Sequence, residues 1–182
     1  WETVTWHDGS PISMGDFVMN MIMTFDRGKP ESAIYDEAYV PALSAYLSHF
    51  KGVRITSTDP LTIETYDDLY YLDAENSITT WWPQYGFGDS PWQTVALGVR
   101  AEIAKLATFS TDKASVIAAE NEAVEWMSFI AGPSLDILHN ELTNAKAEGY
   151  IPYAPTMGTY VTAEEAALRY DNTETWYREQ SH

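Results

Sequence analysis

The sequence is organised around one segment, Trp6-His7-Asp8-Gly9-Ser10-Pro11-Ile12-Ser13, and the helix that follows it. Asp8-Gly9 is a turn dipeptide, because glycine accepts a positive φ without steric penalty. Ser13 is placed to cap a helix N-terminus, and a carboxylate at Asp16 favours the positive end of that helix. We therefore predict a strand, a tight turn and a capped helix that runs from residue 13 to about 26.

Apolar residues of this helix recur at the spacing that one buried face requires. They are Met14, Phe17, Val18, Met21, Ile22 and Phe25. Arg27 and Gly28 suit the C-terminus, the first as a cation and the second as a left-handed residue. If Phe17 is fully buried, its replacement by Ala should cost about 3–5 kcal/mol of stability.

Two segments with alternating apolar residues, 52–57 and 61–66, provide a sheet on which this helix can pack. Ser57-Thr58-Asp59-Pro60 between them has turn chemistry, so the pair is predicted to form an antiparallel hairpin. The fold class that follows is α+β, with the capped helix packed on the hairpin.

The rest of the chain is predicted to be mostly helical. The expected helices cover residues 40–48, 92–106, 111–129, 134–147 and a segment that opens at Thr162 and runs towards Tyr170, with Asn172 placed to cap another. Residues 1–70 thus form an α+β core, and residues 90–182 form a mainly helical elaboration. We treat residues 1–182 as a single domain, because no flexible linker separates the halves.

Composition excludes several functions. The formal net charge of −17 argues against nucleic acid and anionic membrane surfaces as partners. The chain has no cysteine, which removes disulfides and thiolate chemistry. Its four histidines show no metal spacing, so we expect no metal and no cofactor. No apolar run approaches the length of a membrane span.

Clusters of carboxylates are candidates for a catalytic site. They cluster at Asp67-Asp68, Asp73 with Glu75, Glu120 with Glu122 and Glu125, and Glu164-Glu165. Two carboxylates in an aromatic-lined groove could form a glycosidase site. However, the helical glutamates fall opposite the apolar stripes and should be solvated. We expect no catalytic residues and no enzymatic activity, and a carbohydrate-active enzyme or carbohydrate-binding module stays as the alternative.

An aromatic segment between residues 81 and 92 is the main candidate for ligand contact. Tryptophan and tyrosine bind sugars, peptides or proteins through broad apolar faces that carry one polar group. The candidate ligand-binding residues are Trp81, Trp82, Tyr85 and Trp92. The competing interpretation, which we favour, is that these rings seal the junction between the sheet and the helical half.

The opening segment also carries a resemblance to a known family. In that family a strand enters the motif Trp/Phe-x-Asp-Gly-Thr-Pro-hydrophobic-Thr-Ala-x-Asp-Val, and residues 6–17 here are Trp-His-Asp-Gly-Ser-Pro-Ile-Ser-Met-Gly-Asp-Phe. Ser10 and Ser13 keep the hydroxyls of the usual threonines, Phe17 replaces the valine, and Gly15 is a poorer residue for a first helical turn. With the hairpin at the expected distance, the chain resembles family 5 of the extracellular solute-binding proteins, the dipeptide- and oligopeptide-binding components of ABC importers.

The resemblance implies a class II periplasmic-binding-protein-like fold, of which this chain would be an excised fragment covering part of the smaller lobe. It implies capture of peptides or related oligomeric solutes outside the cell and delivery to an ABC permease. The full-length protein would be extracellular or periplasmic and lipid-anchored. Because two lobes close over the solute in that family, we expect the fragment alone to bind peptides weakly or not at all. The signature residues are fold residues, so the resemblance assigns no ligand contact.

Overall fold

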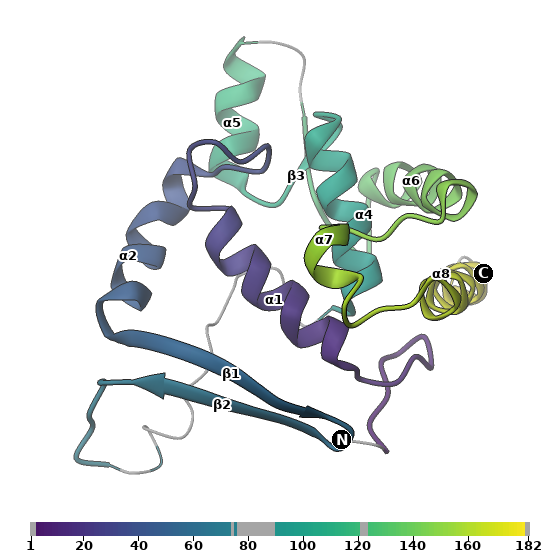
Figure 1. Cartoon of the computed structure of the whole chain (residues 1–182). Coiled ribbons are helices and arrows are strands. Elements are labelled where there is room, and N and C mark those ends of the chain that lie inside the picture. The colour runs from purple at the N-terminus through teal and green to yellow at the C-terminus, as the bar shows by residue number, and fades with distance from the viewer. Residues whose placement is uncertain (1–2, 74, 76–89, 121–123, 181–182) are drawn as a thin grey trace.

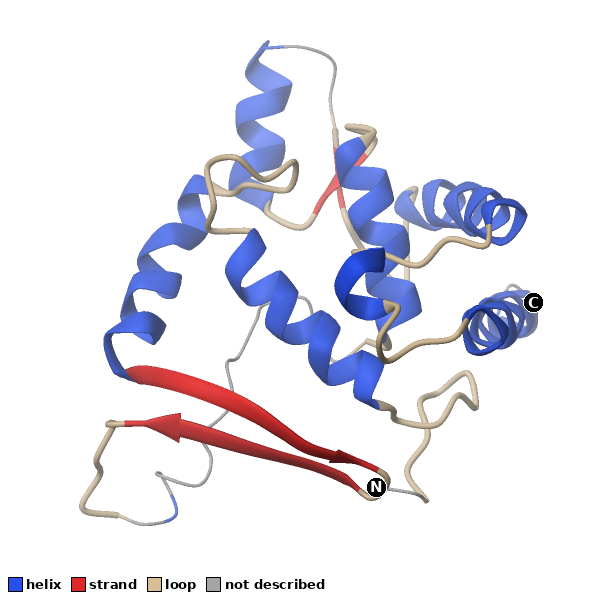
Figure 2. Cartoon of the chain, viewed as in Figure 1, coloured by secondary structure: helices blue, strands red, loops and turns tan. Residues whose placement is uncertain are grey.

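A computed structural model describes residues 3–73, 75, 90–120 and 124–180 of the chain. The protein is mixed helix and sheet, 53% helical with a small antiparallel hairpin, which confirms the predicted α+β class. Figure 1 shows helix α1 between the hairpin on one side and helix α4 on the other. Figure 2 shows helices surrounding α4 on the side away from the hairpin.

Helix α1 (Met14–Asp26) begins where the sequence predicts. The hydroxyl of Ser13 accepts a hydrogen bond from the Gly15 amide at 3.2 Å. In return, Oδ2 of Asp16 accepts one from the Ser13 amide at 2.8 Å, which completes a capping box. Two amides that a helix N-terminus would otherwise leave without partners are thereby satisfied.

The most buried face of α1 differs from the predicted one. Met19 and Met23, which lie outside the predicted stripe, are 1% and 0% exposed in the core cluster, where α1 packs against α4. Phe17, Met21 and Ile22 are only half-buried and face the hairpin. Met14 and Val18 of the predicted face are buried in the core cluster, so the prediction is confirmed in part. It assigned one buried face to a helix that has two packing partners.

The end of α1 also corrects the prediction. Gly28 does not adopt a positive φ, and the C-cap is Arg27 in a right-handed conformation. A Cβ atom added to Gly28 would lie 2.1 Å from Cδ2 of Leu43, so close packing explains the glycine. The buried guanidinium of Arg27 pairs with Asp36 at 2.7 Å instead of remaining at the surface.

Helix α2 (Val40–His49), preceded by the short helix η1 (Glu37–Tyr39), leads directly into the hairpin. Strands β1 (Phe50–Thr58) and β2 (Leu61–Asp67) pair antiparallel, with Ile55 opposite Ile63. Both isoleucines are partly buried and pack against the core cluster. The predicted helix 40–48 and the predicted hairpin are both confirmed.

Helix α4 (Trp92–Ile103) is the centre of the fold, with contacts to α1, α6 and α8. Apolar spacing in the sequence predicts one buried face of six residues: Trp92, Val95, Ala96, Val99, Ile103 and Leu106. The first four of these residues are buried. The other two are not, because the helix ends at Ile103, which is 53% exposed, and Leu106 beyond it is 46% exposed. The dipeptide Ser90-Pro91 in the sequence predicts a helix cap at Ser90, but the N-cap position is Pro91.

The region after α4 departs from the predicted helix at 111–129. Helix α5 spans Thr111–Glu120, and strand β4 (Glu125–Trp126) then pairs in parallel with β3 (Ala107–Thr108). The Met127 amide donates to the Thr108 carbonyl at 2.8 Å, and the Met127 side chain is buried. Tertiary pairing and burial thus override the local helical pattern.

Three helices complete the chain. Helix α6 (Ser134–Glu148) confirms the prediction for 134–147, and a short helix α7 (Ala154–Met157) follows. Helix α8 (Ala163–Gln180) is continuous past Tyr170, so Asn172 does not cap a new helix. Its side-chain amide donates instead to the hydroxyl of Ser10 at 3.2 Å.

Candidate functional site

A polar network ties the Trp6–Ser13 turn to helices α4 and α8. The carboxylate of Asp8 accepts three hydrogen bonds, from the Ser10 amide at 2.9 Å, the side-chain amide of Gln93 at 2.8 Å and the hydroxyl of Thr173 at 2.9 Å. All three donors belong to the fold itself, so the hydrogen bonds of this carboxylate are used within the structure. The Asp8-Gly9 turn is therefore fastened to residues more than eighty positions away.

Arg169 is the second centre of this network and is 1% exposed. Its guanidinium donates to the Pro11 carbonyl at 2.6 Å and to the Gln93 side chain at 3.3 Å. It lies 3.4 Å from Asp16 and donates to Glu165 at 3.1 Å. Because a buried charge is tolerated only when it is paired and hydrogen-bonded, these contacts are structural requirements.

Other carboxylates also have structural partners. Glu102, 4% exposed, accepts a hydrogen bond from the Phe109 amide at 2.8 Å and pairs with Lys113. Glu141 and Glu148 both bind the guanidinium of Arg100. The hydrogen bond from Arg100 lowers the pKa of Glu148 below its usual range. All three carboxylates are therefore engaged by cations of the fold itself.

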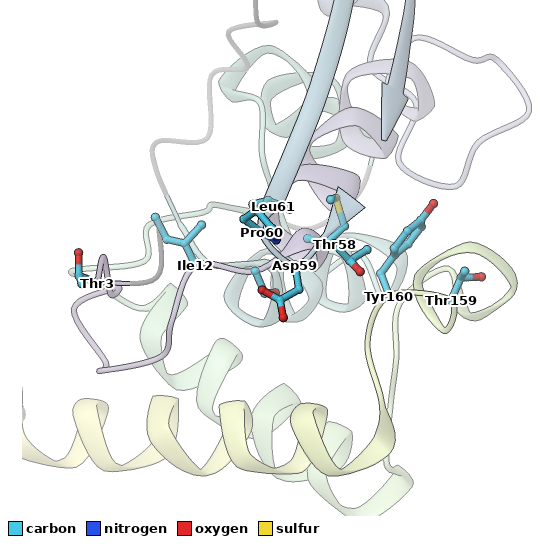
Figure 3. A pocket seen from close by; sticks show the side chains of 10 residues that line it. Thr3, Ile12, Thr58, Asp59, Pro60, Leu61, Thr159 and Tyr160 are labelled. Atoms are coloured by element: carbon cyan, nitrogen blue, oxygen red, sulfur yellow. The ribbon is translucent and has the colours of Figure 1, made fainter. Parts of the chain in front are cut away.

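A hollow of about 550 Å³ lies at the turn of the hairpin. Its walls come from the segment before α1, from the turn between β1 and β2, and from the segment after α7. Figure 3 shows Asp59 and Pro60 of the hairpin turn between Ile12 on one side and Tyr160 on the other. Threonine hydroxyls at Thr3, Thr58 and Thr159 add polar groups to this wall.

A second concave surface, which we call the α8 groove, consists of two hollows of about 230 and 350 Å³. The two hollows share the walls Phe129, Ile130, Trp176 and Tyr177. The Tyr177 hydroxyl donates to the Phe129 carbonyl at 3.4 Å, and burial raises the pKa of Tyr177 to about 12. The groove is therefore aromatic and apolar, and its tyrosine stays neutral.

Of the four sequence-predicted ligand contacts, Trp92 is the one that lies within the described residues. Trp92 is 0% exposed, because it packs inside the core with its ring 5.9 Å from that of Tyr170. It therefore fits the interpretation of a ring that seals the junction. Trp81, Trp82 and Tyr85 lie outside the described residues.

The aromatic residues of the α8 groove were missed from the sequence. Trp176 and Tyr177 occur near the end of a helix, where aromatic residues normally indicate core packing, and Phe129 was placed inside a predicted helix. A local signal did exist, since Trp176-Tyr177 is a pair of adjacent rings that one helix face cannot bury together.

No protein-family model matches this chain, and no curated protein matches it at a significant level. Within the described ranges, no group of three or more His, Asp or Glu side chains could hold a metal ion. A bilayer-spanning helix is likewise not found in the part of the chain that the structure describes.

Proposed function

We propose that this chain is part of the substrate-binding subunit of an ABC importer that captures peptides or related oligomeric solutes outside the cell. In this proposal the chain contributes to the smaller lobe of a class II periplasmic-binding-protein-like fold. A second lobe and the membrane permease are the partners. The motif resemblance at residues 6–17 is the starting point of the proposal.

One observation carries most of the support: the motif residues act together as a fold element. Asp8 fastens the turn to α4 and α8, and Asp16 caps α1 and contacts Arg169. The antiparallel hairpin then lies across α1. Turn, capped helix and hairpin thus occur in the order that the resemblance implies, and the signature residues have structural roles.

The proposal includes the absence of catalysis. Asp8, Glu102 and Glu141 each accept hydrogen bonds from groups of the fold, and Arg27 and Asp36 neutralise each other. General acid–base catalysis requires a carboxylate that can reach the substrate in the correct protonation state. Solute capture needs no such group and relies on concave surfaces with a few polar groups.

A carbohydrate-binding module is the second candidate, and the α8 groove favours it. Trp176 and Tyr177 could stack on sugar rings, while Asp8 and Asp136 line the two hollows. However, the Asp8 carboxylate already accepts three hydrogen bonds within the fold. Asp8 is therefore a poor member of a glycosidase carboxylate pair, but its hydrogen bonds do not argue against sugar binding in the α8 groove.

The test is to purify the full-length protein that contains these residues and to expose it to a pool of mixed short peptides and a pool of oligosaccharides. Mass spectrometry of the retained solutes then identifies the ligand class. We expect peptides to be retained and released on denaturation. Retention of oligosaccharides without peptides would contradict the importer proposal and support the carbohydrate alternative.

A further inference from the structure

A second hollow, beneath the hairpin, borders the hollow at the hairpin turn. This smaller hollow, of about 210 Å³, lies between α1 and the two strands, and it shares Met14 and Tyr160 with the larger one. We call the two together the α1–hairpin trench. Its outer part is the hollow of Figure 3, and its inner part runs along α1.

The inner part of the trench is lined almost entirely by apolar side chains. The lining residues are Met14, Phe17, Val18, Met21, Ile22, Val53, Ile55, Ile63, Thr156 and Tyr160. An apolar cavity of about 150 Å³ is large enough to hold benzene. A hollow of about 210 Å³ therefore accommodates one phenyl ring with a short linker. Methionines in the wall can adjust to the shape of an occupant.

The outer part of the trench has different chemistry. It presents the hydroxyls of Thr3, Thr58 and Thr159 and the carboxylate of Asp59. Among the described residues that line the trench, Asp59 is the only one with a formal charge. The net charge of −17 makes the surrounding potential unfavourable for an anion. A cation at the mouth is thus preferred to a carboxylate.

We propose that the α1–hairpin trench binds a small cationic amphiphile, with one apolar group of about the size of a phenylalanine side chain in the inner part. The ammonium group lies at the mouth, on the side of Asp59. If the importer function holds, the natural occupant is an apolar peptide residue next to a positive charge. Only this last identification rests on the proposed function, because the shape and charge of the trench do not depend on it.

The test uses the 182-residue chain and two matched probes, L-phenylalaninamide, which is a cation, and N-acetyl-L-phenylalaninate, which is an anion. Methyl resonances of methionine and isoleucine report the site by NMR. We expect saturable shifts at Met21, Ile22, Ile55 and Ile63 with the amide in the millimolar range, and weaker binding of the anion. Because Asp59 is exposed, Asp59→Asn should weaken the binding of L-phenylalaninamide by only about two- to fivefold.

Variants that fill the inner part separate binding there from binding elsewhere. Two such variants are Ile63→Trp in the strand and Met21→Trp in the helix. Each should weaken the binding of L-phenylalaninamide at least about tenfold, because the new side chain occupies the space of the phenyl ring. Using both guards against a variant that does not fold. Thr62→Trp is the matched control, since Thr62 is exposed beside Ile63 and does not line the trench.

Three outcomes would overturn the proposal: no saturable shift at these methyl groups, equal affinity for both probes, or unchanged binding in the two filled variants. The result can be separated from that of the importer proposal. Methyl shifts without peptide retention by the full-length protein would leave the trench site standing and contradict the importer. Peptide retention without methyl shifts would support the importer proposal and contradict the trench site.

Discussion

Oδ1 of Asp16 accepts a hydrogen bond from the backbone amide of Trp92 at 2.9 Å. The other oxygen of the same carboxylate accepts from the Ser13 amide at 2.8 Å. One side chain therefore satisfies the first turns of two helices that lie 76 positions apart in the chain. The N-terminus of α4 has no side-chain cap of its own from Pro91, and Asp16 takes this role.

Replacement of Asp16 by Ala should destabilise the protein by about 3–5 kcal/mol, because it removes a cap and leaves the buried Arg169 charge with less compensation. Urea unfolding measures the loss. Asp136→Ala is the control, since Asp136 is exposed in the first turn of α6 and should contribute only about 0.3–1 kcal/mol. Equal losses in the two variants would show that Asp16 is an ordinary helix-end carboxylate.

Gly15→Ala should destabilise the protein, although alanine is the better helix former by about 1 kcal/mol. The added Cβ would lie 2.7 Å from Cγ2 of Val161 and 3.0 Å from Cδ1 of Trp92. Overpacking of this kind costs about 1–3 kcal/mol.

The double variant Gly15→Ala/Val161→Ala tests the cause of this loss. Thermal unfolding of the two single variants and the double variant should show that the double variant loses less stability than the sum of the two single losses. The reason is that the nearest clashing methyl group, Cγ2 of Val161, is absent in the double variant. If Gly15→Ala raises the melting temperature, the close approach of α1 to Val161 and Trp92 is wrong.

Met23→Ala should cost more stability than Phe17→Ala. Met23 is 0% exposed in the core, and truncation of a buried methionine costs about 2–5 kcal/mol. Phe17 is half-buried beside the trench, so we expect about 1–2 kcal/mol, below the range for a fully buried phenylalanine. Chemical denaturation of both variants compares the two losses of stability directly. A larger loss for Phe17→Ala would show that the face predicted from the sequence is the more important one.

These comparisons show which features the sequence could predict. The capping box at Ser13 and Asp16, the hairpin and α6 were predictable because each depends on residues close in the chain. The buried face of α1 was not, because hydrophobic spacing does not say how many neighbours a helix has. The β3–β4 pairing needed Met127 to meet Thr108, a tertiary contact with no local signal.

The candidate site was harder to predict for the same reason. Trp92 was selected for being aromatic, but its position at the start of α4 places it in the core. Tyr160 and Asp59 line the same hollow only after α1, the hairpin and the segment after α7 have come together. A concave surface made by three separate segments leaves no pattern in any one of them.

Acidification should remove the contribution of Glu148 to stability. Its pKa is lowered by the hydrogen bond from Arg100, so its stabilising effect is complete above the ordinary glutamate pKa of about 4.3 and is lost as the pH falls through the lowered value. The difference in urea midpoint between wild type and Glu148→Gln should therefore shrink to zero at low pH. The exposed Glu31→Gln variant serves as the control for net charge. A difference that persists at the lowest pH would contradict the ion pair with Arg100.

Titration of the 182-residue chain with mixed peptides and with oligosaccharides, followed by tryptophan fluorescence and heat, tests the importer account most directly. The account predicts no micromolar binding of either class by this chain alone, because one lobe leaves much of a solute in water and its polar groups without partners. Peptides should bind in the millimolar range at most. Micromolar binding of an oligosaccharide, lost on replacing Trp176, Trp81 or Trp82 by Ala, would contradict the importer account and identify a carbohydrate-binding protein.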